Sequence, residues 1–121
     1  MSRPFKFRIW DEKVGGFDYF DLFSSFGHVP LDIRENVQEF TGAEDTLGGE
    51  IYVGDIVSVQ NNIRRRYEHG EVIYSPEYLA YFVKFYTKSD YYSEYLSHLR
   101  NVHVRMIVIG NVFQNKELLS Q

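Results

Sequence analysis

The sequence predicts a mainly β domain with one short helix. Aromatic residues make up 17% of its 121 residues, including ten Tyr and ten Phe, and these residues favour strands over helical bundles. Short stretches in which apolar and polar residues alternate recur along the chain, as they do in half-buried strands. Glycine-containing turns separate these stretches. About five short strands with a helical insertion before the last are typical of a small SH3-like β-barrel, which we expect in the C-terminal two-thirds.

We expect the chain to form a single domain over residues 1–121, because its length fits one domain and no linker or repeat interrupts it. Residues 1–40 are predicted to form an N-terminal β-hairpin extension, and residues 41–121 the barrel-like core. The sequence leaves two arrangements open. The extension packs into the barrel, or it forms a separate lobe.

The N-terminal extension is predicted to be a hairpin. Phe5-Lys6-Phe7-Arg8-Ile9 alternates apolar with basic residues, as a strand with one buried face does. Gly15-Gly16 predicts a turn, and the aromatic and acidic run from Phe17 to Phe23 predicts the returning strand. Ser24 to Pro30 is expected to be a loop, and Leu31 to Phe40 fits either a short helix or an irregular strand.

A bend between two strands is predicted at the centre of the chain. Thr41-Gly42 is expected to end the preceding element, and Ala43 to Gly49 to form a polar loop. Glu50 to Val53 and Ile56 to Val59 are strongly β-forming. Gly54-Asp55 lies between them and predicts a tight bend, because Gly tolerates positive φ and Asp bonds its neighbouring backbone.

The C-terminal half is predicted to contain further strands and one helix. The expected strands and turns are a turn at Gln60–Asn62, strands at Gly70–Tyr74, Tyr81–Tyr86 and Val102–Ile109, and a helical turn at Asn115–Leu119. Ser89-Asp90 predicts the N-cap of a short helix that ends near Leu99. Tyr92, Tyr95 and Leu96 share the apolar stripe of this predicted helix.

Three stretches of the sequence carry motifs that match one family in the same order. Phe5 to Asp11 matches the pattern K-F-R-x-W-D, and Phe40 to Val57 is similar to TG-x-x-D-x-x-G-x-EIY-x-GDIV. Ile109 to Leu119 is like the closing pattern IGN-(I/V)-(Y/F)-x-N-x-E-L-L. Together they resemble the YopX-like family of small proteins encoded by phages and prophages. The resemblance implies a phage-derived, β-rich domain, and it carries over no catalytic residues.

The sequence departs from the family pattern at a few positions. Ala43-Glu44 stands where the family usually has Leu-Lys, and Lys116 stands where Pro is common. Residues Tyr78 to Arg100 match only loosely. The motif residues that we expect to shape the backbone are Thr41, Gly42, Gly49, Gly54, Asp55, Gly110 and Asn111.

Asp55 is the most specific candidate for a general base or a metal ligand. Acid–base catalysis needs a second carboxylate or a His at a fixed distance, and the sequence identifies none. We therefore expect Asp55 to form a structural bend. The acidic residues Asp11, Glu12, Asp18 and Asp21 offer oxygen ligands for a divalent cation, but they form no known motif, which favours a solvated strand face.

The sequence lacks the usual motifs of enzymes and metal sites. Its four His residues have neither the i, i+4 spacing nor the His-x-His spacing that would direct two imidazoles at one metal. No phosphate-binding loop, dinucleotide fingerprint or nucleophile elbow is present. We expect no catalytic residue, no metal and no cofactor.

Two segments are candidate contact surfaces. Arg64-Arg65-Arg66-Tyr67 places three guanidinium groups beside a stacking ring, which suits phosphates and bases, although such a charge run is also typical of a solvated loop. The Tyr-rich stretch from Tyr74 to Tyr95 suits a protein interface or the outer layer of the core. Exposed Tyr beside free strand edges also indicates self-association, so a homo-oligomer is expected.

The composition narrows the class of protein. The sequence has no Cys, which excludes disulfides and thiolate metal sites and fits a reducing cytoplasm. No apolar run approaches the roughly 20 residues of a membrane-spanning helix. Met1 to Trp10 lacks the apolar core of a signal peptide. The net charge of −4 argues against coating nucleic acid or anionic membranes. We expect a protein of the bacterial host's cytoplasm that does not bind membranes.

The leading hypothesis is a non-enzymatic phage or prophage accessory protein that binds a macromolecule, in first place another protein. The second is a nucleic-acid-binding module that uses Arg64 to Tyr67. The third is a hydrolase or nuclease that uses Asp55 with the N-terminal acidic residues. The identity of the partner is not encoded in any motif of the sequence.

Overall fold

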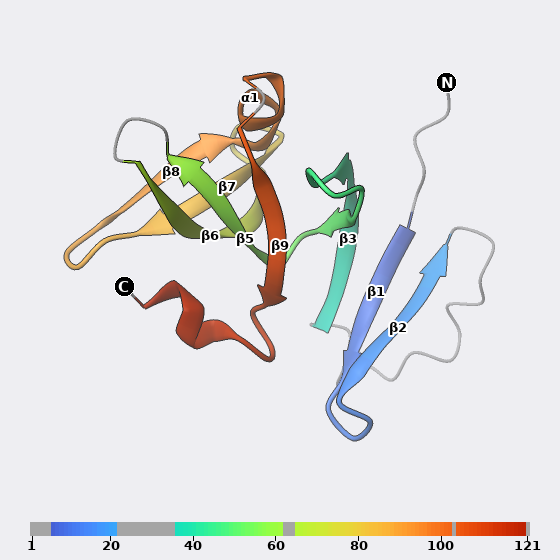
Figure 1. Cartoon of the computed structure of the whole chain (residues 1–121). Helices are drawn as coiled ribbons and strands as arrows, with labels where there is room; N and C mark the ends of the chain where they lie inside the picture. Colours follow the sequence, from blue (N-terminus) through green and yellow to red (C-terminus); the bar gives the residue numbers. More distant parts are fainter. Residues whose placement is uncertain (1–5, 22–35, 62–64, 103, 121) are drawn as a thin grey trace.

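The computed structural model describes residues 6–21, 36–61, 65–102 and 104–120 (Figure 1). These residues form nine strands, one α-helix and a C-terminal 3₁₀ turn. In chain order the elements are β1 (Lys6–Asp11), β2 (Gly16–Asp21), β3 (Val37–Glu44), β4 (Glu50–Tyr52), β5 (Asp55–Asn61), β6 (Arg66–Ser75), β7 (Ala80–Tyr86), β8 (Tyr91–Tyr95), α1 (Leu96–Asn101), β9 (Met106–Asn111) and η3 (Lys116–Leu119). The prediction of a mainly β fold with one short helix is confirmed over these residues.

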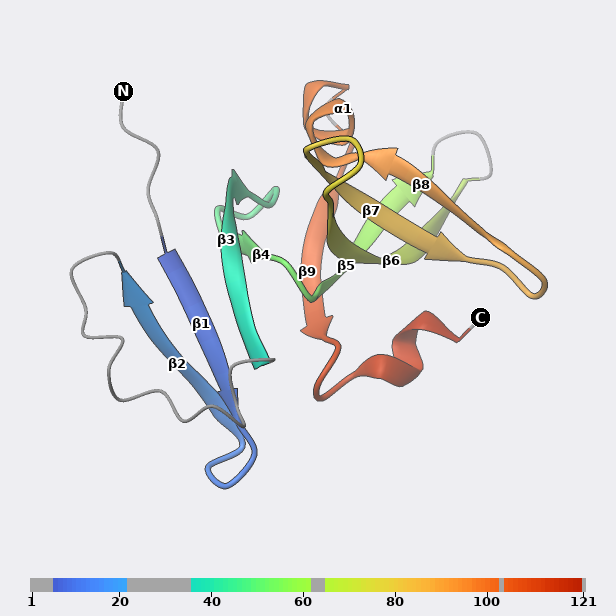
Figure 2. The same ribbon diagram turned by 180° about the vertical axis from the view of Figure 1, so that it is seen from behind.

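The strands of the described chain form two antiparallel sheets. The first has the order β2-β1-β3-β4, and the second has the order β8-β7-β6-β5-β9. Figures 1 and 2 show β3 and β4 between the β1–β2 hairpin and the second sheet. The second sheet curls into half of a barrel, and the SH3-like barrel stays a prediction. β3 spans residue 40, the position at which the sequence predicts that the N-terminal extension ends. It pairs with β1 on one side and with β4 on the other.

The predicted N-terminal hairpin is confirmed. β1 pairs with β2 along its whole length, from Lys6 opposite Asp21 to Asp11 opposite Gly16. The turn between them uses Gly15, which has a φ of 72° and donates its N–H to the Asp11 carbonyl over 2.8 Å. Glycine adopts this left-handed conformation without a steric penalty, so the glycine pair determines where the hairpin turns.

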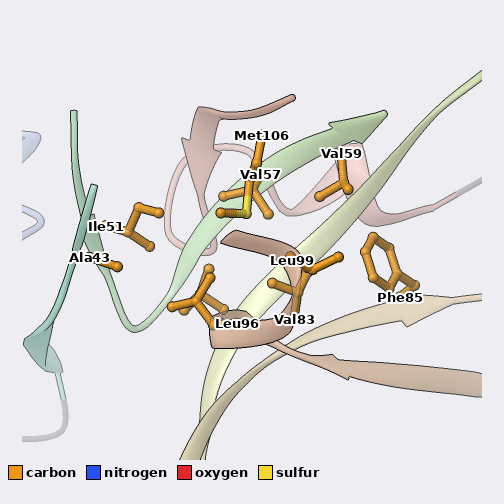
Figure 3. Close-up of a cluster of buried hydrophobic side chains, with 10 residues drawn as sticks. Ala43, Ile51, Val57, Val59, Val83, Phe85, Leu96, Leu99 and Met106 are labelled. Carbon is orange, nitrogen blue, oxygen red and sulfur yellow. The ribbon is translucent and has the colours of Figure 1, made fainter. Parts of the chain in front are cut away.

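The two sheets share one hydrophobic core. Ten buried side chains form it: Ala43, Ile51, Val57, Val59, Val72, Val83, Phe85, Leu96, Leu99 and Met106 (Figure 3). Ala43 and Ile51 come from β3 and β4, and Leu96 and Leu99 come from α1. Because side chains alternate across a strand, Ile51 faces this core while Tyr52 faces the β1–β2 hairpin. β4 is therefore packed on both sides.

The prediction that Thr41-Gly42 ends an element is wrong. β3 continues through both residues to Glu44, and its pairing with β4 is irregular between Phe40 and Glu44. Gly42 has a φ of 85°, as expected where a strand is distorted without being broken. The Thr41 hydroxyl donates a hydrogen bond to the Ile51 carbonyl over 2.7 Å, which keeps β3 and β4 together across the irregularity.

The helix predicted from Ser89-Asp90 to Leu99 is largely wrong. Residues 91–95 form β8, and only Leu96–Asn101 are helical. β8 pairs with β7 along its length, and the Tyr92 ring stacks on Phe85 with centroids 5.0 Å apart. Asp90 lies in the preceding turn and does not cap a helix. Pairing and ring packing against β7 override the helical spacing of the apolar residues.

Smaller differences concern strand ends. β5 continues to Asn61, so a turn does not begin at Gln60, and β9 begins at Met106 and not at Val102. The loop predicted at Ser24–Pro30 and the position His103 lie outside the described residues. No helix in the part of the chain that the structure covers is long and apolar enough to cross a membrane.

Replacing Gly54 by Ala is expected to lower the free energy of unfolding by about 1–3 kcal/mol. Gly54 has a φ of 95°, and a Cβ atom there would lie 1.8 Å from the Gln38 side-chain amide nitrogen. Urea denaturation measures the effect. Gly16→Ala is the control, because a Cβ at Gly16 meets no atom within 4 Å, and we expect a change below about 1 kcal/mol. Equal effects of the two substitutions would contradict this prediction.

Candidate functional site

A buried ion pair joins the two sheets. Arg8 lies on β1 and Asp55 begins β5, and the Arg8 Nη2 group donates to the Asp55 Oδ1 atom over 2.7 Å. The Arg8 Nε group donates to Gln38 Oε1 over 2.8 Å. The second Asp55 oxygen, Oδ2, accepts the Tyr52 backbone N–H over 2.7 Å. Arg8 and Asp55 are only 5% and 2% exposed, so the pair is shielded from water.

Two aromatic rings enclose the guanidinium group. The Arg8 Cζ atom lies 4.0 Å from the Phe17 ring centroid and 4.8 Å from the Tyr52 ring centroid. A desolvated guanidinium gains electrostatic attraction from the faces of such rings. Tyr19 packs edge-on against Tyr52 and extends the aromatic layer toward the surface. The rings therefore compensate part of the cost of removing Arg8 from water.

The position of Asp55 is structural. Burial raises the pKa of its carboxyl above the ordinary value, although the Arg8 guanidinium acts in the opposite direction. Each carboxylate oxygen accepts one hydrogen bond from the protein, and the side chain is shielded from water. Within the described ranges, no group of three or more His, Asp or Glu residues is placed to hold a metal ion. Asp55 fixes the start of β5 and anchors β1.

The three motif stretches of the sequence meet at this junction. Arg8 comes from the first stretch and Asp55 from the second. In the third stretch, Asn111 pairs with Asp55 in the β5–β9 ladder, and the Phe113 ring stacks on Trp10 with centroids 5.5 Å apart. Residues far apart in the chain thus form one continuous contact between the sheets.

The neighbouring loops are held by side chains from the same stretches. The Asp45 carboxylate accepts the Gly49 N–H over 2.7 Å and the Val108 N–H over 3.0 Å, which ties the β3–β4 loop to β9. Asn111 Oδ1 accepts the backbone N–H groups of Phe113 and Gln114, each over 3.0 Å. These bonds fix the turns on either side of the junction.

A family model described as YopX protein matches residues 22–120, which is most of the chain. The chain belongs to the YopX family. A search of curated proteins gives no significant match. The YopX match includes β3 to η3, and its residues Asp55 and Asn111 are among those that build the junction.

The structure describes only part of the predicted arginine contact. Arg64 lies outside the described residues. Arg65 and Arg66 are exposed, and Arg65 has a φ of 54°. The Arg66 Nε atom lies 3.5 Å from an oxygen of Glu68, a buried carboxylate on the same strand. Tyr67 is half exposed beside them. The exposed guanidinium of Arg66 thus lies beside a negative charge of the same strand.

A second surface lies on the outer side of β6, β7 and β8, away from the core. We call it the aromatic face. At one end of this face, Tyr78 packs edge-on against Phe82 at 5.6 Å and Tyr95 is tilted against Phe82 at 4.4 Å, both between ring centroids. Tyr78, Tyr91 and Tyr95 are 60%, 56% and 44% exposed. The sequence indicated a Tyr-rich surface here, but only the strand pairing shows which tyrosines share a side.

Lys84 contacts the two paired tyrosines at the other end of the aromatic face. Its Nζ atom lies 4.0 Å from the Tyr91 ring centroid and 5.3 Å from that of Tyr86. The Tyr86 hydroxyl donates a hydrogen bond to Glu71 over 3.1 Å. Burial, and then the charge of Glu71, raises the pKa of Tyr86. The face therefore combines apolar rings, hydroxyl groups and one cation whose position the rings constrain.

A groove of about 630 Å³ borders the aromatic face. It is lined by Glu71, Tyr86, Thr87, Lys88, Lys116, Leu119 and Ser120. η3 forms its far wall and is attached to β6, because the His69 ring nitrogen Nδ1 lies 3.2 Å from the Leu118 carbonyl oxygen. The groove and the aromatic face share Tyr86, so together they form one extended surface.

Replacing Arg8 by Met is expected to lower the free energy of unfolding by about 3–5 kcal/mol, because Asp55 is left buried and unpaired. In the double variant Arg8→Met/Asp55→Asn, the neutral amide oxygen still accepts the Tyr52 N–H. Urea denaturation should show that the double variant loses less stability than the two single variants added together. Lys6→Met, which breaks the exposed Lys6–Glu50 pair, is the control and should cost about 0–1 kcal/mol. Simple additivity of the Arg8 and Asp55 effects would contradict this prediction.

Stability is expected to fall at alkaline pH through Tyr52. Burial, and next the charge of Glu50, raises the pKa of its phenol from 10.0 to about 12. Between these values the unfolded chain loses the Tyr52 proton while the folded chain retains it, so rising pH favours unfolding. Urea denaturation from neutral pH to pH 12 should therefore show a smaller loss for Tyr52→Phe than for the wild-type protein. If the free energy of unfolding fell equally with pH in both proteins, the pKa of Tyr52 would not be raised in the folded state.

Proposed function

We propose that the protein is a non-enzymatic binding module that docks another protein on the aromatic face. The observation that supports it is the exposure of Tyr78 and Tyr95, which pack on the Phe82 ring, and of Tyr91, which lies beside Lys84. Tyr is enriched among the residues that contribute most to protein–protein binding, because its ring buries a large area at low cost in conformational entropy.

The construction of the face supports this proposal. Its tyrosines lie on paired strands or pack against them, so much of the binding geometry exists before a partner arrives. Its one central cation, Lys84, is held between Tyr86 and Tyr91. Few charges and many aromatic rings are typical of the centre of a protein interface.

The proposed setting is the cytoplasm of a bacterial host, where the module serves as a phage or prophage accessory protein. The motifs that resemble the YopX-like family support a phage origin. The absence of Cys from the whole sequence fits a reducing compartment. The partner is then a protein of the host or of the phage.

Affinity capture from lysogenic or infected cells tests the proposal. We expect the wild-type protein to retain a defined partner, and the variant Tyr78→Ser/Tyr95→Ser to bind it about tenfold more weakly or worse. Tyr19→Ser is the matched control, because Tyr19 is 63% exposed but lies on the first sheet. Equal capture by all three proteins would place the partner elsewhere and sink the proposal for this face.

Binding to nucleic acid is the competing outcome. Fluorescence anisotropy with labelled single-stranded and double-stranded DNA and RNA, at two salt concentrations, detects it. Salt-sensitive binding that is lost in Arg65→Ala/Arg66→Ala, but kept in Tyr78→Ser/Tyr95→Ser, would replace the protein-binding proposal with a nucleic-acid module. We expect no such binding, because Arg66 lies beside Glu68 and the chain carries a net charge of −4.

A further inference from the structure

β8 leaves one edge of the second sheet open. It is the outermost strand in the order β8-β7-β6-β5-β9, and no other described strand pairs with its outer edge. The opposite edge of this sheet is different, because β9 bonds Thr46 and Asp45 of the β3–β4 loop. An unpaired edge presents backbone N–H and C=O groups that can pair with a strand of another molecule.

The hairpin before β8 shows which backbone groups point outward. The Thr87 N–H donates to the Asp90 carbonyl over 2.7 Å, so this pair of residues is hydrogen-bonded. Hydrogen-bonded and non-hydrogen-bonded pairs alternate along an antiparallel ladder. Tyr92 and Glu94 therefore bond to β7, while the backbone groups of Ser93, which lies opposite Lys84, point away from it.

The Tyr91 backbone agrees with this alternation. Its N–H donates to the side-chain Oδ1 of Asp90 over 2.8 Å and not to β7. Ser93 is exposed and occupies the middle of the five-residue strand. The centre of the outer edge is thus a small residue with outward-directed backbone groups, which a second strand can approach closely.

We propose that a second copy of the chain pairs with this edge, antiparallel and around a two-fold axis at Ser93. In this register the two Ser93 residues exchange reciprocal N–H···O=C hydrogen bonds. Tyr91 of one copy lies opposite Tyr95 of the other, and Tyr92 lies opposite Glu94. Each five-stranded sheet then continues into the sheet of the second copy.

Charge selects this register over its neighbours. An axis at Glu94 would place the two Glu94 carboxylates opposite each other. An axis at Tyr92 would place Glu94 of one copy opposite Asp90 of the other. Like charges directly opposite on paired strands are destabilising. Among these three registers, only the axis at Ser93 pairs aromatic with aromatic residues and leaves no like charges facing.

The pairing also extends the aromatic face. Tyr91, Ser93 and Tyr95 alternate with Tyr92 and Glu94, so all three project on the side that carries Lys84 and Phe82. Joining two β8 strands brings the two aromatic faces side by side as one surface. The dimer does not depend on the proposed function of this face, which a single chain already carries.

Charge substitutions at Ser93 test the dimer. Sedimentation or light scattering across a concentration series should give the wild-type protein twice the mass of one chain. Ser93→Lys and Ser93→Glu each place like charges at the axis, and each should weaken self-association about tenfold or more. An equal mixture of the two variants should recover the doubled mass, because opposite charges then meet. Ser93→Ala keeps the backbone N–H and should behave as the wild type.

Four results would overturn the proposal: a wild-type protein that stays a single chain at every concentration, charge variants that still dimerise, a mixture of them that stays monomeric, or an altered mass for Ser93→Ala. Circular dichroism verifies that each variant is folded.

Ser93→Pro gives a second measurement. Proline removes an N–H that β8 does not use toward β7, and it is tolerated on an edge strand. It should abolish the dimer. Tyr78→Ser separates the two proposals, because Tyr78 lies on the aromatic face but outside β8. It should weaken partner capture and leave the doubled mass unchanged, so either proposal can fail alone.

Discussion

The ion pair between Arg8 and Asp55 is the interaction on which the arrangement of the two sheets depends. Removing two charges from water is costly, and an isolated pair seldom compensates for this cost. Here the guanidinium also donates a hydrogen bond to Gln38 and lies against two aromatic rings. The carboxylate also accepts the Tyr52 backbone N–H. The pair places β1 against the start of β5. We infer that its main contribution is the specificity of this arrangement.

The motifs that indicate the YopX family lie largely at this junction. Arg8, Asp55 and Asn111 join strands, and Asp45 holds a loop against β9. These residues are buried or bonded to backbone, so the pattern describes how the chain folds. The aromatic face lies on β7, β8 and the turn before β7, outside the three motif stretches.

Local pattern was sufficient to predict the β1–β2 hairpin and the bend at Gly54, because alternation and glycine conformation depend on neighbouring residues alone. It failed at β8, because the i, i+3, i+4 spacing of Tyr92, Tyr95 and Leu96 fits a helix, whereas pairing with β7 makes residues 91–95 a strand. The Arg8–Asp55 contact joins residues 47 positions apart, and a basic residue in an alternating strand reads as exposed. Which tyrosines share the aromatic face likewise depends on β7–β8 pairing, which the sequence does not encode locally.

The place of β5 in the sheet has a consequence for how the chain is made. β5 lies between β6, which follows it closely, and β9, which pairs with it through Asp55 opposite Asn111. The ribosome synthesises β6, β7, β8 and α1 between β5 and β9. One edge of β5 therefore has no partner strand until β9 is made. The core that contains Met106 cannot close before then. Completion of the fold is thus delayed until nearly the whole described chain has been synthesised.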